Sequence, residues 1–280
     1  MSQKRKKLIL NCILFVVLLL CAVFFAIPFL YMFFMSLMES SNAIFQYPPK
    51  LYSGAFYVVN YFEAIEYVNM LKLFKNTVIM VISSMAIGIT SSILRAYGFS
   101  RFKNKYSNFF FVLLLSTMMI PWVVTMIPAY AEFEFLGWIG TRAPLIVPWI
   151  GGSAFNVFML KQFMDDIPFD LDEAAKMDGA NAITILFYVI IPSIKPCLAT
   201  LLVYAFINAW SDYVGPSIYL QSNPDLFTLS LGMQQFFSST GSANWAHVMA
   251  ASVLFSIPMV LVLTLAQKAF VRGVVSSGVK

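Results

Sequence analysis

The sequence predicts an all-α, polytopic membrane protein with six transmembrane helices. Of the 280 residues, 60% are hydrophobic and only 11% are charged, and the mean hydropathy is +0.80. A soluble globular domain has about half of its residues apolar and about a quarter charged, so a buried core alone does not explain this composition. The charged residues stand in short clusters between long apolar runs, which is typical of a chain that crosses a bilayer repeatedly. We therefore attribute the net charge of +5 to membrane topology and not to nucleic-acid binding.

Six apolar segments are candidates to cross a bilayer, which takes about 20 residues of helix. They cover residues 8–38, 76–94, 106–131, 143–161, 189–211 and 247–268, and we expect them to form a single transmembrane domain over residues 1–280. The first segment follows a basic run, as in a signal peptide, but it is about twice the usual length and no A-x-A cleavage site follows. We therefore expect it to remain as a span. Prolines within the segments, among them Pro121, Pro192 and Pro196, predict kinks.

The distribution of basic residues predicts the orientation of the chain. With the N-terminus inside, the outer segments carry only Lys50, Lys72, Lys75 and Arg142, and the inner segments carry the rest of the 18 lysines and arginines. Cytoplasmic loops are enriched in lysine and arginine. Both termini are therefore predicted to be cytoplasmic.

The inner loop of residues 165–188 predicts two short helices joined by a sharp corner. Asp170 suits the N-cap of the first helix, and Glu173, three residues later, would complete a capping-box-like pair. Gly179 can adopt the left-handed conformation that ends a helix. Asn181 can then cap a second helix over residues 182–188. From the residues alone, this element is either a docking surface for another protein or a plain helical corner.

The same loop resembles the EAA loop of ABC importer permeases, whose pattern is E-A-A-x-x-x-G followed by I-x-L-P. The matching residues here are Glu173-Ala174-Ala175, Gly179 and Val189-Ile190-Ile191-Pro192. Other segments resemble the carbohydrate-uptake branch of that family, namely Tyr47-Pro48-Pro49-Lys50, Ala96–Phe102, Ile120-Pro121, Ile127-Pro128 and the C-terminal tail. The chain thus resembles the maltose-type, MalG-like permeases over nearly its whole length.

The resemblance implies a type I ABC importer permease fold with a cytoplasmic coupling helix, in a bacterial cytoplasmic membrane. It implies that the coupling contact with a cytoplasmic ATPase is made by Glu173, Ala174, Ala175, Asp178, Gly179 and Ala180. The expected partners are a second permease in a heterodimer, two ATP-binding subunits and an extracytoplasmic sugar-binding protein. ATP and magnesium would be bound by the ATPase subunits, because the glycine-containing tail that ends at Lys280 does not match a phosphate-binding loop.

Polar residues within or at the ends of the apolar segments are candidates for a substrate path. Tyr204, Asn208 and Asp212 recur every fourth residue and so share one helix face, which should point away from lipid. Asn156 is a similar candidate in the fourth segment. The alternative is hydrogen bonding between helices, for which small polar groups are commonly used.

The outer loop after the fifth segment is a candidate contact for the binding protein. Its tip contains Ser239, Thr240, Gly241 and Ser242, which are small residues suited to entering a partner's cleft. Its aromatic residues would also suit a belt at the lipid interface.

The sequence bears on three other function classes. An ion-coupled secondary transporter needs ionisable groups at mid-membrane, and the candidate spans lack them there. The secondary transporter is therefore the less favoured alternative. A membrane enzyme needs a catalytic or metal-binding cluster, for which one histidine and three cysteines leave little material, so we do not expect an enzyme or a metal site. An ABC permease for a non-sugar solute such as glycerol phosphate or a polyamine remains an alternative.

Overall fold

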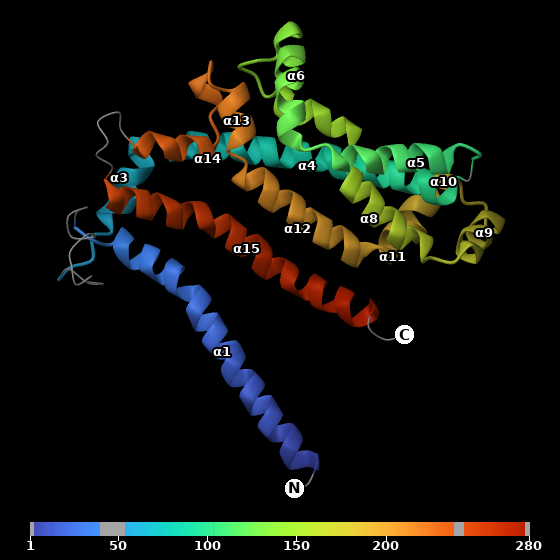
Figure 1. Ribbon diagram of the computed structural model, residues 1–280, viewed down its shortest axis with the longest axis horizontal. Helices are drawn as coiled ribbons and strands as arrows, with labels where there is room; N and C mark the ends of the chain where they lie inside the picture. The colour runs from blue at the N-terminus through green and yellow to red at the C-terminus, as the bar shows by residue number, and fades with distance from the viewer. Residues whose placement is uncertain (1–2, 40–53, 103, 238–243, 278–280) are drawn as a thin grey trace. The chain divides into compact units, whose positions relative to one another are not determined.

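The computed structural model describes residues 3–39, 54–102, 104–237 and 244–277, and every regular element within these ranges is helical. The chain divides into two compact units. The first consists of Met1–Met70 and Met233–Ile257, and the second of Leu71–Gly232 and Pro258–Lys280. The helices are labelled in Figure 1.

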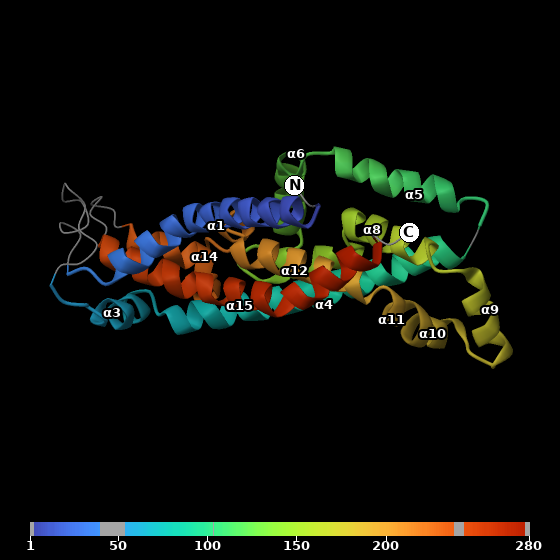
Figure 2. The ribbon, with the colours of Figure 1, turned by 90° about the horizontal axis from the view of Figure 1, so that it is seen from below.

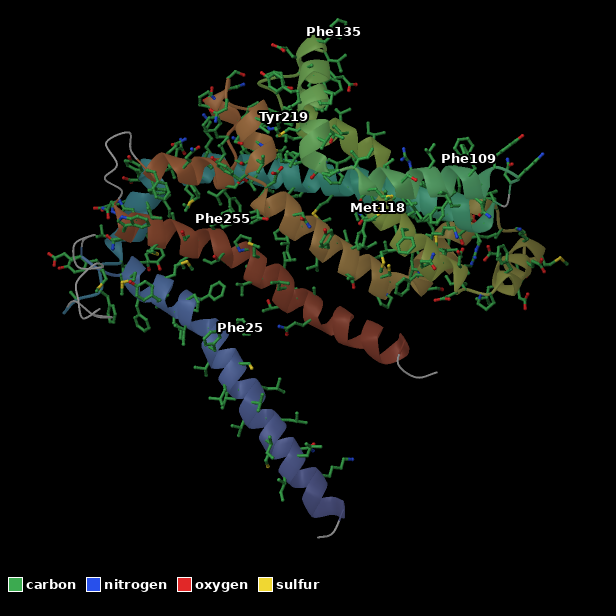
Figure 3. All side chains as sticks on the ribbon, viewed as in Figure 1. Phe25, Phe109, Met118, Phe135, Tyr219 and Phe255 are labelled. Carbon is green, nitrogen blue, oxygen red and sulfur yellow. The ribbon has the colours of Figure 1, made fainter. Side chains whose placement is uncertain are left out.

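The first unit is dominated by a long apolar helix, α1 (Gln3–Ser36). Its stretch Ile9–Ser36 has a mean hydropathy of 3.1, and its hydrophobic side chains are exposed nearly all round, as Figure 3 shows along the helix that carries Phe25. A helix that is apolar on every face is suited to a lipid environment. By length and composition this segment is therefore suited to cross a membrane, in agreement with the predicted first span.

A small polar network holds the end of α1 to α3 (Val59–Tyr67). The side-chain amide of Asn60, which is buried, donates to the backbone carbonyls of Ser36 and Met38 at 2.9 and 2.8 Å. These carbonyls lie at and beyond the last turn of α1, where no further helical donors are available. Met35 and Met38 pack beside them with Ala246, which belongs to the first turn of α15 (Trp245–Ser277).

The second unit contains most of the helices. They are α4 (Met70–Arg101), α5 (Ser107–Ser116), α6 (Trp122–Phe135), α7 (Ala143–Ile146), α8 (Ala154–Asp165), α9 (Phe169–Met177), α10 (Ala182–Ile185), α11 (Ile191–Ser193), α12 (Lys195–Ser211), α13 (Val214–Tyr219) and α14 (Leu229–Gly232). Short 3₁₀ turns follow α5, α7 and α13, and a π-helical stretch, Leu186–Ile190, joins α10 to α11.

Two of the predicted spans are sharply bent. Ser107–Met119 and Trp122–Phe135 meet at 98°, and Ala182–Ser193 and Lys195–Ser211 meet at 82°. Figure 1 shows the first bend between α5 and α6. At this bend Ile120 is extended, with ψ 116°, because the ring of the following Pro121 disfavours helical backbone before it. By length and composition, four of the described helices are suited to cross a membrane, or six if each bent pair is one span.

One buried cluster, here called the main cluster, organises the second unit. It is formed by Ile89, Ala96, Tyr97, Val157, Leu160, Met164, Ile185, Leu186, Ile190, Ile194, Cys197 and Leu201. These side chains come from α4, α8, α12 and the segment around α10 and α11. The cluster thereby connects the loop of residues 165–188 to the long helices.

Candidate functional site

The loop of residues 165–188 forms the predicted corner, built from α9, a tight reversal and α10. Gly179 has φ +85°, a left-handed conformation that glycine adopts without steric cost. Its N–H donates to the carbonyl of Lys176, and the N–H of Ala180 donates to that of Ala175, both at 2.9 Å. This pair of bonds is the Schellman motif that ends many helices. Figure 2 shows the reversal between α9 and α10.

The two predicted helix caps had different outcomes. Asn181 caps α10, since its side-chain oxygen accepts from the N–H of Thr184 at 2.9 Å. The prediction that Asp170 caps α9 in a pair with Glu173 is wrong. The N-cap is Pro168, which makes no side-chain hydrogen bond, and Asp170 already lies in the first turn. There its negative charge still interacts favourably with the positive end of the helix dipole.

The six predicted coupling residues divide into an outer and an inner set. Glu173, Ala174, Asp178 and Gly179 are exposed, whereas Ala175 and Ala180 are partly buried and pack against the main cluster. The two inner alanines therefore attach the corner to its own protein. The outer residues remain accessible to another one.

Large apolar side chains close in sequence to the corner are also exposed. Met177 is 88% exposed, Ile183 68% and Tyr188 80%. An exposed apolar patch bordered by charged residues often marks a protein interface. The corner therefore offers exposed charged, small and apolar side chains together.

A buried ion pair beneath the corner was not predicted. Arg101, the last residue of α4, places Nε 2.9 Å from Oδ2 of Asp172 on α9, and their side chains are 3% and 5% exposed. The two residues are far apart in sequence. The sequence feature that could have indicated this pair is the position of Asp172 in the loop, close to two other acidic residues.

The predicted substrate-path residues converge on one cleft. Asn156 on α8, Tyr204 and Asn208 on α12, and Asp212 at its end all line a cleft of about 360 Å³. The rest of the lining comes mainly from α4 and from the segment before α8 and consists of Met80, Ser84, Met85, Gly88, Ile89, Leu145, Trp149, Ser153, Ala205 and Ala209. Among the described lining residues, Asp212 is the only one with a formal charge.

Local packing fixes the polar groups of this cleft. The amide of Asn208 donates to the carbonyl of Tyr204 at 2.7 Å, so it stays on its own helix. The N–H of Ser153 donates to Oγ of Ser92 at 3.2 Å, which brings the start of α8 close to α4. Gly88 lies against Trp149, and an added Cβ would be 3.2 Å from the indole ring. The cleft therefore combines an aromatic face with uncharged polar groups and the single carboxyl of Asp212.

Asp212 is held at the end of the cleft, just beyond α12. Its Oδ1 accepts the N–H of Gly215 at 3.1 Å. Burial raises the pKa of this carboxyl above 3.8, although backbone hydrogen bonds from Gly215 and Val214 partly oppose the shift. The group is thus an ionisable side chain whose charged form is disfavoured by its surroundings.

One further prediction concerns the outer loop after α14. Ser239, Thr240, Gly241 and Ser242, predicted to contact a binding protein, lie outside the described residues. Within the described ranges, no group of three or more His, Cys, Asp or Glu side chains is arranged to hold a metal ion.

Comparison with solved structures identifies the fold. The transmembrane architecture matches a chain of a bacterial ABC transporter involved in the import of the acidic polysaccharide alginate. The TM-score is 0.80 at 24% sequence identity, over 96% of this chain and 98% of the other. The predicted type I ABC importer permease fold is confirmed.

Sequence comparison identifies the family. The chain is 32% identical over 219 residues to the galactooligosaccharides transport system permease protein GanQ of Bacillus subtilis (strain 168), covering 78% of this chain and 76% of GanQ. It is 30% identical over 275 residues to the sn-glycerol-3-phosphate transport system permease protein UgpE of Brucella abortus (strain 2308), covering 95% and 96%. Residues 88–276 match the family model of the binding-protein-dependent transport system inner membrane component. The chain belongs to this family of ABC transporter permeases and is a multi-pass membrane protein, not an enzyme.

Proposed function

We propose that the chain is a permease subunit of an ATP-driven importer for a neutral sugar or oligosaccharide. It pairs with a second permease, receives its substrate from an extracytoplasmic binding protein and is driven by two cytoplasmic ATP-binding subunits. The family is defined by dependence on a binding protein, which supports the direction of transport. Both termini lie in the cytoplasm, as the basic residues predict.

The lining of the cleft is the observation that carries the substrate class. Asn156, Asn208 and Tyr204 offer amide and hydroxyl groups that match sugar hydroxyls, and Trp149 offers an aromatic face for a sugar ring. The described lining contains no lysine, arginine or histidine. A site for a phosphate or carboxylate ligand is expected to contain a positively charged side chain that binds the anion.

Relatives support transport of sugars and also of a phosphate ester. GanQ is named for galactooligosaccharides and UgpE for sn-glycerol-3-phosphate. The absence of a basic residue among the described lining residues favours the neutral solute for this chain. Glycerol phosphate is therefore the second candidate.

The corner between α9 and α10 supports the coupling role. It offers the exposed residues Glu173, Ala174, Asp178 and Gly179 together with apolar neighbours to an ATP-binding subunit. It is also anchored by Ala175 and Ala180 to the main cluster, which includes residues of α4, α8 and α12. Movement of a subunit docked at the corner would therefore reach the helices that line the cleft.

The test of the substrate class is uptake by the assembled importer in proteoliposomes. A neutral oligosaccharide should be taken up with ATP, and sn-glycerol-3-phosphate should not. Asn208→Ala should reduce sugar uptake. Its matched control is Thr200→Ala on the same helix, because Thr200 also donates to the carbonyl four residues earlier but does not line the cleft.

Each outcome of this experiment has a clear meaning. Loss of sugar uptake with Asn208→Ala and normal uptake with Thr200→Ala supports the cleft as the path. Equal uptake by both variants contradicts the role of Asn208 in the path. Uptake of glycerol phosphate in preference to the sugar contradicts the proposed substrate class.

A further inference from the structure

We propose that the buried pair Arg101–Asp172 is a clamp that makes α4 follow the coupling corner, so that α4 carries the motion of an ATP-binding subunit to the substrate cleft. This inference rests on the proposed coupling function and deepens it. Arg101 and Asp172 are positioning residues in this account, because they act on the corner and not on the substrate.

Arg101 contacts the corner at several points. Besides the 2.9 Å approach of its Nε to Asp172, its Nη2 donates to the carbonyl of Ile167 at 3.1 Å. Its guanidinium also lies over the ring of Phe169, 4.6 Å from the ring centre. One side chain at the end of α4 therefore engages the start of α9 and the segment immediately before it. Figures 1 and 2 both show α9 beyond the end of α4.

The last turn of α4 also contacts both flanks of the corner. Tyr97 Oη donates to the carbonyl of Ala182, the first residue of α10, at 3.1 Å. Ser100 Oγ donates to Oδ1 of Asp165, the last residue of α8, at 2.6 Å. The end of α8, the start of α9 and the start of α10 thus share one anchor. A displacement of the corner relative to α4 would break several of these contacts together.

Burial makes the ion pair sensitive to displacement. Two charges removed from water are tolerated only while they compensate each other, and separating them leaves an unpaired buried charge. Oδ1 of Asp172 and Nε of Arg101 both lack a hydrogen-bond partner among the described residues, so the charge of Asp172 is compensated by electrostatic attraction to the guanidinium, whose Nε lies 2.9 Å from Oδ2. Apolar side chains would fill the same space without this requirement. The ionic pair therefore holds the geometry more strictly than an apolar contact would.

The helix α4 connects the clamp directly to the cleft. Ser84, Met85 and Gly88 of α4 line the cleft, and the helix continues without a break to Arg101. At about 1.5 Å per residue, the distance along the helix from Gly88 to Arg101 is roughly 20 Å. A helix is stiff over this length. Rotation or translation imposed at Arg101 therefore moves the wall of the cleft.

The experiment replaces the pair by apolar residues in the assembled importer. Arg101→Met combined with Asp172→Leu removes both charges and so leaves none unpaired. We expect the subunits still to co-purify and to hydrolyse ATP, while the amount of sugar imported per ATP falls roughly 5- to 150-fold, the usual range of an allosteric coupling. The matched control is Lys72→Met combined with Asp225→Leu, which removes an exposed ion pair at the other end of α4 and should leave this ratio unchanged.

The outcomes separate this inference from the proposed function. If the wild-type complex imports sugar and the double variant imports as much sugar per ATP as wild type, the clamp is overturned and the proposed function stands. Failure of the wild-type chain to bind an ATP-binding subunit overturns the proposed function instead. If the double variant does not accumulate, Asp172→Asn, which keeps the shape of the side chain and removes its charge, decides the question in the same assay. A normal ratio for Asp172→Asn would then overturn the clamp, and a reduced ratio would support it.

Discussion

The corner between α9 and α10 gives a graded prediction at Gly179. Its φ of +85° is left-handed, and a Cβ built at this position would have no atom within 4 Å apart from its neighbours in the chain. Gly179→Ala therefore introduces no clash, and its cost is that of the backbone conformation alone. For an L-residue this cost is about 1–2 kcal/mol. A difference of this size changes a two-state ratio by a factor of about 5–30.

Gly179→Pro should have a much larger effect. The proline ring fixes φ at about −65°, which is incompatible with the corner, and it removes the N–H that donates to the carbonyl of Lys176. The cost of such a misplaced proline is about 3 kcal/mol or more. We expect Gly179→Ala to lower sugar uptake per ATP about 5- to 30-fold if the corner must form for coupling. Gly179→Pro should abolish coupled uptake.

Gly137 provides the matched control for this series. It follows α6 in the same motif, with φ +69° and open space around its Cβ position. Its N–H donates to the carbonyl of Glu134 at 2.9 Å, and that of Trp138 donates to Phe133 at 2.8 Å. Gly137→Ala should therefore cost the same in stability, but it alters a predicted outer loop instead of the coupling corner.

The assay measures ATP hydrolysis and sugar uptake by the reconstituted importer, with thermal stability measured in parallel. Similar losses of stability in the two alanine variants, combined with a loss of coupling only at Gly179, would support the reasoning. Equal losses of coupling at both sites would refute it. Normal uptake by Gly179→Pro would refute it as well.

Three further predictions follow from other parts of the second unit. Asn76→Ala should destabilise the chain by about 1–3 kcal/mol, because the buried amide bonds two backbone carbonyls and accepts from Arg142, and denaturation monitored in detergent tests this. Gly232→Ala should cost a similar 1–3 kcal/mol in the same assay, since its Cβ would overlap the buried side chain of Leu73, and an unchanged midpoint would contradict this close packing. Burial raises the pKa of Asp212 in the folded chain above its ordinary value of 3.8. The protonated carboxyl therefore stabilises the fold fully below pH 3.8, and this stabilisation is lost as the pH rises through the folded pKa. The unfolding midpoint of Asp212→Asn minus that of wild type at the same pH should therefore increase with pH. A difference between the two midpoints that does not change with pH would contradict the burial of this carboxylate.

Local chemistry explains which features of the corner were predictable. Gly179 and Asn181 act through their own backbones and immediate neighbours, so their roles follow from residue type and spacing. The capping prediction at Asp170 is wrong because Pro168 and Phe169 already set the start of α9, and residue spacing alone does not show which neighbour takes the N-cap position. Helix capping thus depends on where the first turn begins.

The long-range features were less accessible from the sequence. Spacing of four residues predicted that Tyr204 and Asn208 share a face, and the cleft brings them together with Asn156. Trp149 was not among the candidates, because a tryptophan in an apolar segment has no periodic signature. Hydropathy shows how long an apolar segment is but does not show where it bends. The breaks at Pro121 and before Pro196 were therefore predicted only as kinks. The number of spans and their boundaries over residues 1–280 stay a prediction.

The contact between Arg101 and Asp172 was likewise not predictable from the sequence. Each residue belongs to a charged inner segment and would ordinarily be assigned to solvent. Their burial depends on the way in which α4 and α9 meet, which requires tertiary structure.

Photo-cross-linking from the corner tests the central claim most directly. Met177 lies on α9 and is 88% exposed, so a photoreactive phenylalanine derivative can replace it without disturbing the packing. In the assembled importer, illumination should attach the ATP-binding subunit to this position, whereas the same derivative at Phe135, which is 90% exposed at the end of α6, should not capture that subunit. Capture of the ATP-binding subunit from Phe135 and not from Met177 would contradict the account.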